Sequence, residues 1–173
     1  MSAVLRRRGP VALRFRRKPK PADADAVRAL ARRTGVFTAE ECAVAGELVY
    51  ARLELGGRSG YHFVFVDRAD DLVGYVAWGP IPMTRASYDL YWIIVDPTCQ
   101  GTGLGRDLMR RTEEAVLARG GGAVYIETSS VDRYARTRRF YRRAGYRQVA
   151  RLSDFYAPGD HKIVFCKTLI RNA

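Results

Sequence analysis

The amino-acid sequence predicts an α/β protein whose single mixed sheet, mostly antiparallel, has about seven strands and about four flanking helices. Stretches of β-branched and aromatic residues alternate with stretches of helical periodicity, and a strand–helix–strand unit lies mid-chain. A capping box and several glycine stops bound the helices. Since no Pro/Gly-rich linker divides the 173 residues, we expect one domain over residues 11–173, after a basic arm at residues 1–10.

The first third of the chain predicts one strand and two helices. Residues 11–17 alternate apolar and polar side chains, as a strand does, and prolines end the run. A helix is expected from its cap at Asp23 to the stop at Gly35. Thr38 and Glu41 form a capping box for a second helix, which should run to about residue 55.

The rest of the chain predicts six strands and two helices. Two β-rich runs, residues 61–66 and 72–78, should form an antiparallel hairpin. Residues 88–95 are apolar on both faces, which is typical of a central strand buried on both sides. With a helix over 103–119 and a strand over 123–128, this strand should make a parallel crossover. A helix from about Asp132 to Gly145 and strands over 147–156 and 162–169 complete the order.

Composition excludes several classes of protein. No apolar run approaches the roughly 20 residues that a membrane span needs, and the basic start lacks the apolar stretch of a secretory signal. Three scattered cysteines and two histidines argue against a disulfide framework or a zinc site. We therefore expect a cytoplasmic protein with no membrane partner and no metal.

The formal charge of +12 is concentrated in two clusters. Residues 1–20 carry eight basic side chains and no acid, and residues 133–151 carry eight arginines. Such clusters suit nucleic acid, an anionic surface or a phosphate-rich ligand. A solvated basic surface is the alternative, because no RNA-binding or helix-turn-helix motif accompanies either cluster.

A glycine-rich turn, Gln100-Gly-Thr-Gly-Leu-Gly105, lies between the central strand and the following helix. The first amides of a helix have no internal partner, the helix dipole is positive there, and glycines let backbone come close to a phosphate. A pyrophosphate is therefore the expected ligand. The turn fits neither a dinucleotide fingerprint, because residue 106 is arginine, nor a P-loop, because no Lys-Ser/Thr follows Gly105. Alternatively, it is a glycine-rich helix start that binds nothing.

Two motifs resemble one family. Gln100-x-x-Gly103-x-Gly105, directly after a strand that ends Ile-Val-Asp-Pro97, is similar to the pyrophosphate loop of the GNAT superfamily of N-acetyltransferases. The helical segment 134–146, with its Phe-Tyr141 pair followed by Gly-Tyr146, also resembles that family. The order of elements matches from about residue 11 to residue 169, and most closely over 88–146.

The resemblance implies that acetyl-coenzyme A is the acetyl donor. The turn would bind the pyrophosphate, and the end of the central strand would pair with the pantetheine arm. Where many members carry an asparagine after the next strand, this chain has Ser129 and Ser130. The cofactor contacts implied are Ile93, Ile94, Val95, Gln100, Gly101, Thr102, Gly103, Leu104, Gly105, Arg106, Ser130, Tyr134 and Thr137.

Direct attack by an amine in a ternary complex needs a base for the amine and an acid for the leaving thiolate. The resemblance implies that Tyr141 is the acid, and the alternative is a core tyrosine on an aromatic helix face. Asp89 is the first choice for the base; by period two it shares a face with Tyr91, Ile93 and Val95. Glu127 on the adjacent strand is the second. Either carboxylate could instead pair structurally with an arginine.

The acceptor is expected to be a primary amine, on a small molecule or on a peptide or protein. The helices over 23–55 and the turn at 155–160 would flank its groove, with Tyr91, Phe155 and Tyr156 as contacts. Arginines facing the groove would favour acidic acceptors or acceptors held on nucleic acid. The sequence leaves open whether the protein forms a homodimer. The alternative function is a non-catalytic binding module on a degenerate scaffold, which docks nucleic acid or an acidic partner through the basic arm.

Overall fold

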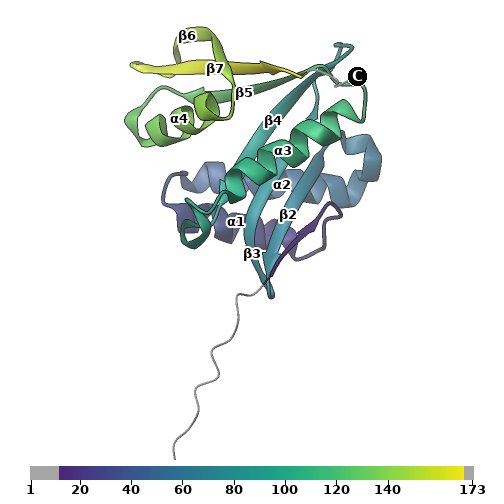
Figure 1. Cartoon of the computed structure of the whole chain (residues 1–173). Coiled ribbons are helices and arrows are strands. Elements are labelled where there is room, and N and C mark those ends of the chain that lie inside the picture. The colour runs from purple at the N-terminus through teal and green to yellow at the C-terminus, as the bar shows by residue number, and fades with distance from the viewer. Residues whose placement is uncertain (1–11, 170–173) are drawn as a thin grey trace, which may run out of the picture.

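The computed structural model describes residues 12–169, so the predicted basic arm lies outside the described residues. The predicted order of elements is confirmed (Figure 1). The strands are β1 (Leu13–Arg16), β2 (His62–Arg68), β3 (Asp71–Pro80), β4 (Ser87–Val95), β5 (Ala123–Ser129), β6 (Arg147–Ala157) and β7 (Asp160–Thr168). The helices are α1 (Asp23–Thr34), α2 (Ala39–Leu55), α3 (Leu104–Leu117) and α4 (Ala135–Arg143).

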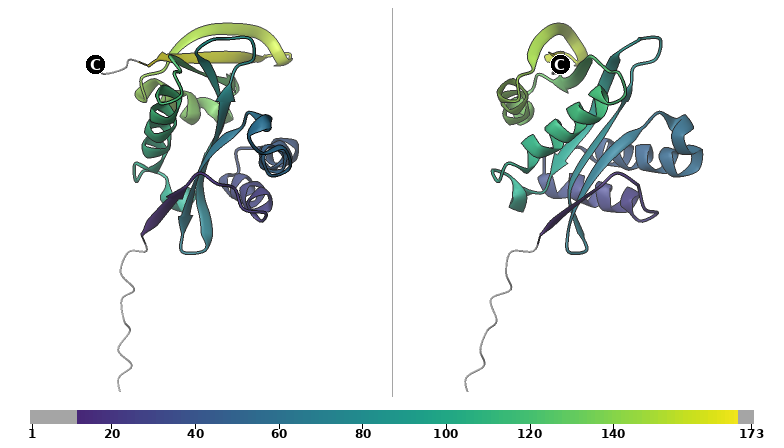
Figure 2. Two further views of the ribbon diagram at one scale, coloured as in Figure 1. Left: turned by 90° about the vertical axis from the view of Figure 1, so that its right-hand side faces the viewer. Right: turned by 45° about the vertical axis from the view of Figure 1, so that its right-hand side comes forward.

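The seven strands form one sheet in the order β1-β2-β3-β4-β5-β7-β6. Every neighbouring pair is antiparallel except β4 and β5, which are parallel and joined through α3, as predicted. Helices cover both faces: α3 and α4 lie on one side of the sheet, and α1 and α2 lie on the other (Figure 2). No helix within residues 12–169 combines the length and the apolar character that crossing a membrane requires.

The core consists of two apolar clusters, one on each face of the sheet. The first contains Leu108 of α3, Tyr141 of α4 and Phe165 of β7. The second contains Leu30 of α1, Val49 of α2 and other buried residues of these helices and of β2, β3 and β4. Since alternate residues of β2 and β3 contribute to opposite clusters, these two strands are buried on both faces.

The predicted start of α1 is wrong by one residue. Ala22 is the N-cap, and Asp23 is the first helical residue. Its carboxylate binds both terminal nitrogens of Arg16 at 2.6 Å and accepts a hydrogen bond from the Lys20 amide at 2.6 Å. A largely buried guanidinium needs such a counter-charge, so Asp23 ties β1 to α1 instead of capping the helix.

The capping box of α2 is confirmed. The Glu41 amide donates to the Thr38 hydroxyl at 3.2 Å, and the Thr38 amide donates to the Glu41 carboxylate at 2.7 Å. Thr38→Ala is expected to lower the free energy of unfolding by about 1 kcal/mol, because an amide of the first turn loses its acceptor. Urea denaturation would measure this. Ser153→Ala, on the exposed strand β6, serves as the control and should stay within about 0.5 kcal/mol of the wild type.

β4 is central in the sheet, but the prediction that it is buried on both sides is wrong. Only Leu90 and Ile94 of the strand are buried, and Tyr91 is 38% exposed. The reason is that β4 and β5 diverge: residues 87–89 pair with residues 123–125, and no further pairs follow. Beyond Asp89, no strand of the described chain pairs with β4 on that side.

Candidate functional site

The divergence of β4 and β5 leaves an open edge on β4 over residues 90–95. On its other side this stretch pairs with β3, and the facing part of β5 pairs with β7. The main-chain groups along the open edge therefore need another partner. The glycine-rich turn follows one end of this edge, and a cavity lies beside its middle.

A bulge changes which way the β4 side chains face. Trp78 pairs with Leu90 and Ala77 pairs with Trp92, so Tyr91 is an extra residue without an opposite partner. Leu90 packs in the cluster beside α3, whereas Trp92 packs in the cluster beside α1 and α2, although they are two residues apart. The prediction that Asp89 shares a face with Ile93 and Val95 is therefore wrong. Asp89, opposite to Leu90, faces the side of α1 and α2.

The glycine-rich turn leads directly into α3. Gly101 and Gly103 have φ of +79° and +94°, and a Cβ on either would meet no atom within 4 Å. Gly103 is the N-cap and provides no side-chain cap, and the Asp107 amide donates to the Gly103 carbonyl at 3.1 Å. The Asp107 amide is the first in α3 with an acceptor inside the helix. The amides of residues 104–106 come before it and have no such acceptor, so they are free to bind an anion.

Three residues of the turn have structural roles beside any binding role. The Gln100 side-chain amide donates to the Val95 carbonyl at 3.1 Å and so ties the turn to the end of β4. A Cβ at Gly105 would lie 3.3 Å from the Phe140 ring, so this glycine allows α4 to pack close to the start of α3. The Thr102 hydroxyl donates to the Cys99 carbonyl at 2.7 Å.

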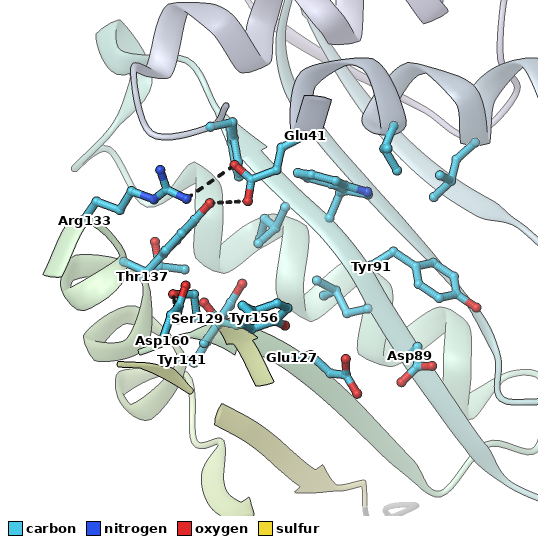
Figure 3. Close-up of a pocket in the computed structure, with 18 of the residues that line it drawn as sticks. Glu41, Asp89, Tyr91, Glu127, Ser129, Arg133, Thr137, Tyr141, Tyr156 and Asp160 are labelled. Carbon is cyan, nitrogen blue, oxygen red and sulfur yellow. Dashed lines mark hydrogen bonds and ion pairs between the residues drawn. The ribbon is translucent and has the colours of Figure 1, made fainter. Parts of the chain in front are cut away.

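A cavity of about 570 Å³ occupies the space between the diverging strands (Figure 3). Residues of α2, β4, β5 and α4, together with the β6–β7 hairpin, line it. Of the predicted residues, the lining includes Asp89, Tyr91, Ile93, Glu127, Tyr134, Thr137, Tyr141 and Tyr156. It does not include Ile94, Val95, the turn 100–106, Ser130 or Phe155.

Tyr141 comes from α4 and is only 5% exposed. Its ring packs in the core against Phe165, at 5.7 Å between centroids, while the residue also lines the cavity. Burial raises the pKa of its hydroxyl, so this group carries its proton at neutral pH. Packing and a cavity position are thus compatible, and the two interpretations of this tyrosine do not exclude each other.

Asp89 and Glu127 lie near each other at the end of the cavity where β4 and β5 still pair. Burial, and next the negative charge of Glu127, raise the pKa of Asp89, while Lys162 opposes the shift. Glu127 is half exposed and pairs with Lys162 at 2.7 Å. Among the described residues no ion pair engages Asp89, so it is the carboxylate better placed to take up a proton.

Several residues that were predicted to contact the cofactor or the acceptor instead contact other residues of the chain. The Tyr134 hydroxyl donates to Glu41 at 2.7 Å, and burial followed by this contact raises its pKa. Ser130 holds β5 to β7: its hydroxyl accepts from the His161 amide at 2.9 Å. The Phe155 ring is half exposed and lies 3.7 Å below the Lys162 ammonium.

Sequence reasoning missed some residues of the cavity. Glu41 was recognised only as a helix cap, yet its carboxylate also lies in the cavity, with Arg133 3.9 Å away. Asp160 of β7 lines it as well and accepts from the Ser129 hydroxyl at 2.5 Å. Both lie in segments that the sequence predicts beside the acceptor groove, but no local pattern singles out these two carboxylates. Tyr61 and Phe37, which were also missed, add aromatic walls to the cavity.

The comparisons with known proteins agree with this architecture. A family model described as an acetyltransferase (GNAT) domain matches residues 58–148. The chain is 33% identical over 96 residues to N-alpha-acetyltransferase RimI of Mycobacterium tuberculosis, a match that covers 55% of this chain and 58% of that protein. The chain thus spans little more than half the length of this curated relative.

Solved structures extend the likeness to nearly the whole chain. A GNAT-family protein from Desulfovibrio desulfuricans is 46% identical, with a TM-score of 0.89 over 92% of this chain and 100% of that one. An aminoglycoside 6'-N-acetyltransferase complexed with coenzyme A shares the fold at 22% identity, with a TM-score of 0.72 over 94% and 99% of the two chains. The matched domain and the sheet split beside a glycine-rich helix start together show that this chain belongs to the GNAT acetyltransferase family.

Proposed function

We propose that the protein is an acetyl-coenzyme A-dependent N-acetyltransferase, in which a primary amine attacks the thioester directly in a ternary complex. The observation that supports this most is the open edge of β4, with the glycine-rich turn at one end and the cavity at its side. A linear donor with a diphosphate at one end and a thioester at the other matches that layout.

The proposed binding site for the acetyl donor consists mainly of main-chain groups. The free amides at residues 104–106 and the open space above Gly101 and Gly103 fit a pyrophosphate. The open edge at Ile93–Val95 fits the amides of a pantetheine arm, which would lie beside β4 as an added strand does. Thr102, Leu104 and Arg106 belong to the same helix start, and Thr137 lies farther along, in the cavity.

The cavity supplies the groups that the reaction needs. An amine with a pKa of about 10.4 is nucleophilic in only about one molecule per thousand at neutral pH, so a proton must leave it. The amine nitrogen forms a bond to the acetyl carbon while the carbon–sulfur bond breaks. The amine proton passes to Asp89, directly or through water, and Tyr141 donates its proton to the departing sulfur.

The lining of the cavity favours an acceptor with positive charge. Four carboxylates, Glu41, Asp89, Glu127 and Asp160, line it against one arginine, Arg133, although the protein as a whole carries +12. An acidic acceptor would need several arginines along the groove. Because Arg133 is the one arginine in this lining, the cavity does not favour acidic acceptors. The aromatic walls suit ammonium groups as well. We propose a cationic amine as acceptor, with Tyr91 and Tyr156 among its contacts, and the name of the RimI relative adds peptide α-amines to those to be tested.

Calorimetry and thiol release test this proposal. Coenzyme A should bind the purified protein, and acetyl-coenzyme A should release thiol in the presence of a suitable amine. The panel should contain diamines, aminoglycosides, N-terminal peptides and acidic amino acids. No affinity for coenzyme A would overturn the proposed function, and turnover confined to acidic amines would overturn the proposed acceptor class. The alternative, a binding module that docks through the arm, has no supporting observation in residues 12–169.

Gly101→Ala should weaken coenzyme A binding about 10-fold, because an L-residue at φ +79° strains the turn by about 1–2 kcal/mol and favours other conformations. Gly159→Ala is the matched control: its φ is +80°, it also has open space, and it lies in the β6–β7 turn. Both variants should lose similar stability, and only the first should lose affinity in calorimetry. Equal affinities would argue against the turn as the pyrophosphate site.

A further inference from the structure

A second hollow lies at the edge of the sheet where β1 stops short. β1 pairs with residues 65–68 of β2, so within the described chain the start of β2, residues 62–64, has β3 on one side and no strand on the other. The segment that follows β1, the end of α2 and the end of α3 surround this edge and leave a hollow of about 140 Å³. That is roughly ten times the space that one water molecule requires.

Four cationic side chains from three separate parts of the chain line this hollow. Arg17 and Lys18 follow β1, Arg52 belongs to α2, and Arg119 comes just after α3. No carboxylate lines the hollow, and none of the four lies within 4.0 Å of a described carboxylate. The neighbouring Arg16 differs, because Asp23 and Asp67 neutralise it. Convergent unpaired cations repel each other, and a bound anion relieves that repulsion.

Trp78 adds a second, independent observation. This residue is 2% exposed and lines the hollow, and its indole N–H is buried without a hydrogen-bond acceptor. A buried donor without a partner is costly and uncommon in folded proteins. The Arg119 guanidinium lies 5.2 Å from the centroid of the same ring, so this cation and the indole lie together beside the hollow.

The surroundings of His62 in this hollow disfavour the charged form of its imidazole. Its ring lies 4.5 Å from the Trp78 ring, centroid to centroid. Burial, and then the positive charges of Arg119 and Arg52, lower the pKa of His62 to about 4. The imidazole is therefore neutral at pH 7, and the charged side chains that line the hollow with it are all cations.

We infer that this hollow binds the phosphate group of a small phosphorylated compound, at a site separate from the donor and acceptor sites. A phosphate monoester carries about −1.5 to −2 charges at pH 7 and accepts several hydrogen bonds, so it balances more of the cationic charge than a carboxylate does. The hollow has room for a phosphate group but is much smaller than the main cavity. Tyr61 lines both spaces, so the bound phosphate lies next to the acceptor site.

Side-chain NMR of the full chain tests the inference, since the only histidines are His62 and His161. Inorganic phosphate is titrated against chloride at constant ionic strength. We expect saturable shifts of His62 and of the Trp78 indole N–H, no saturable shift of His161, and a higher pKa of His62 with phosphate bound. Lys18→Gln and Arg119→Gln should each weaken phosphate affinity about 10-fold, as loss of a charged hydrogen bond does.

Arg110→Gln is the control, because Arg110 lies on α3 but pairs with Asp107 and Glu114 away from the hollow. It should leave the affinity unchanged. Equal shifts in chloride, no saturation at 50 mM phosphate, or equal loss in the Arg110 variant would each overturn the inference. A short single-stranded RNA forms a separate arm, and binding of RNA without binding of inorganic phosphate would also overturn it. Coenzyme A should not compete with phosphate for His62.

Discussion

Tyr141→Phe is expected to lower kcat about 10²-fold or more while coenzyme A affinity stays unchanged, because the departing thiolate loses its proton donor. Burial raises the pKa of Tyr141, so the wild-type hydroxyl stays protonated through neutral pH and well into the alkaline range. The substitution removes one oxygen atom from a ring that packs against Phe165 and Tyr146, so the fold should survive. Steady-state kinetics by thiol release, with calorimetry for coenzyme A, measure the two quantities.

Tyr146→Phe provides the matched control for that variant. Tyr146 is equally buried, but its hydroxyl donates to Glu113 at 3.1 Å, and it does not line the cavity. Its loss should reduce stability by roughly 1 kcal/mol and leave kcat nearly unchanged. If Tyr141→Phe keeps full turnover with intact donor binding, Tyr141 is a packing residue and another group protonates the sulfur.

Asp89→Asn is expected to lower kcat/KM about 10²-fold and to remove the acidic limb of its pH profile. A base works in its deprotonated form, so wild-type kcat/KM should rise as pH increases through the pKa of Asp89. Burial and Glu127 raise that pKa above 3.8, which moves the limb toward neutral pH. The measurement is kcat/KM as a function of pH with one amine acceptor.

Glu127→Gln separates the two candidate bases. Glu127 is paired with Lys162, so its loss should lower the pKa of Asp89 and shift the acidic limb toward lower pH without abolishing it. If instead Glu127→Gln removes the limb and Asp89→Asn keeps it, the second candidate is the base and our assignment is wrong.

Local signals in the sequence were sufficient for the order of elements. The capping box at Thr38 and the glycine-rich turn at residues 100–105 each depend on neighbouring residues, and each forms as predicted at the level of backbone. The parallel crossover through α3 follows from one strand, one helix and the next strand. The helical period places Tyr141 on an aromatic face of its helix, but it does not predict the cavity beside that face.

The rest depends on contacts between distant segments. The carboxylates of Glu41 and Asp160 reach the cavity from α2 and β7, and nothing near them in sequence marks them as cavity residues. Asp23 was predicted to cap a helix, but its carboxylate instead pairs with the guanidinium of Arg16. Ser130 was predicted to contact the cofactor, but its hydroxyl accepts a hydrogen bond from the His161 amide and so joins β5 to β7.

The extra residue at Tyr91 has a consequence for how this strand tolerates change. Because one residue too many sits between Leu90 and Trp92, removing any one position from the middle of β4 would restore simple alternation. With Tyr91 removed, Leu90 would stay on the α3 side and Trp92 on the side of α1 and α2, so Asp89, Ile93 and Val95 would keep the sides that they face now. The extra residue can therefore be lost without turning the Asp89 carboxylate away from the cavity, and a homologue without it could keep a base at the same place.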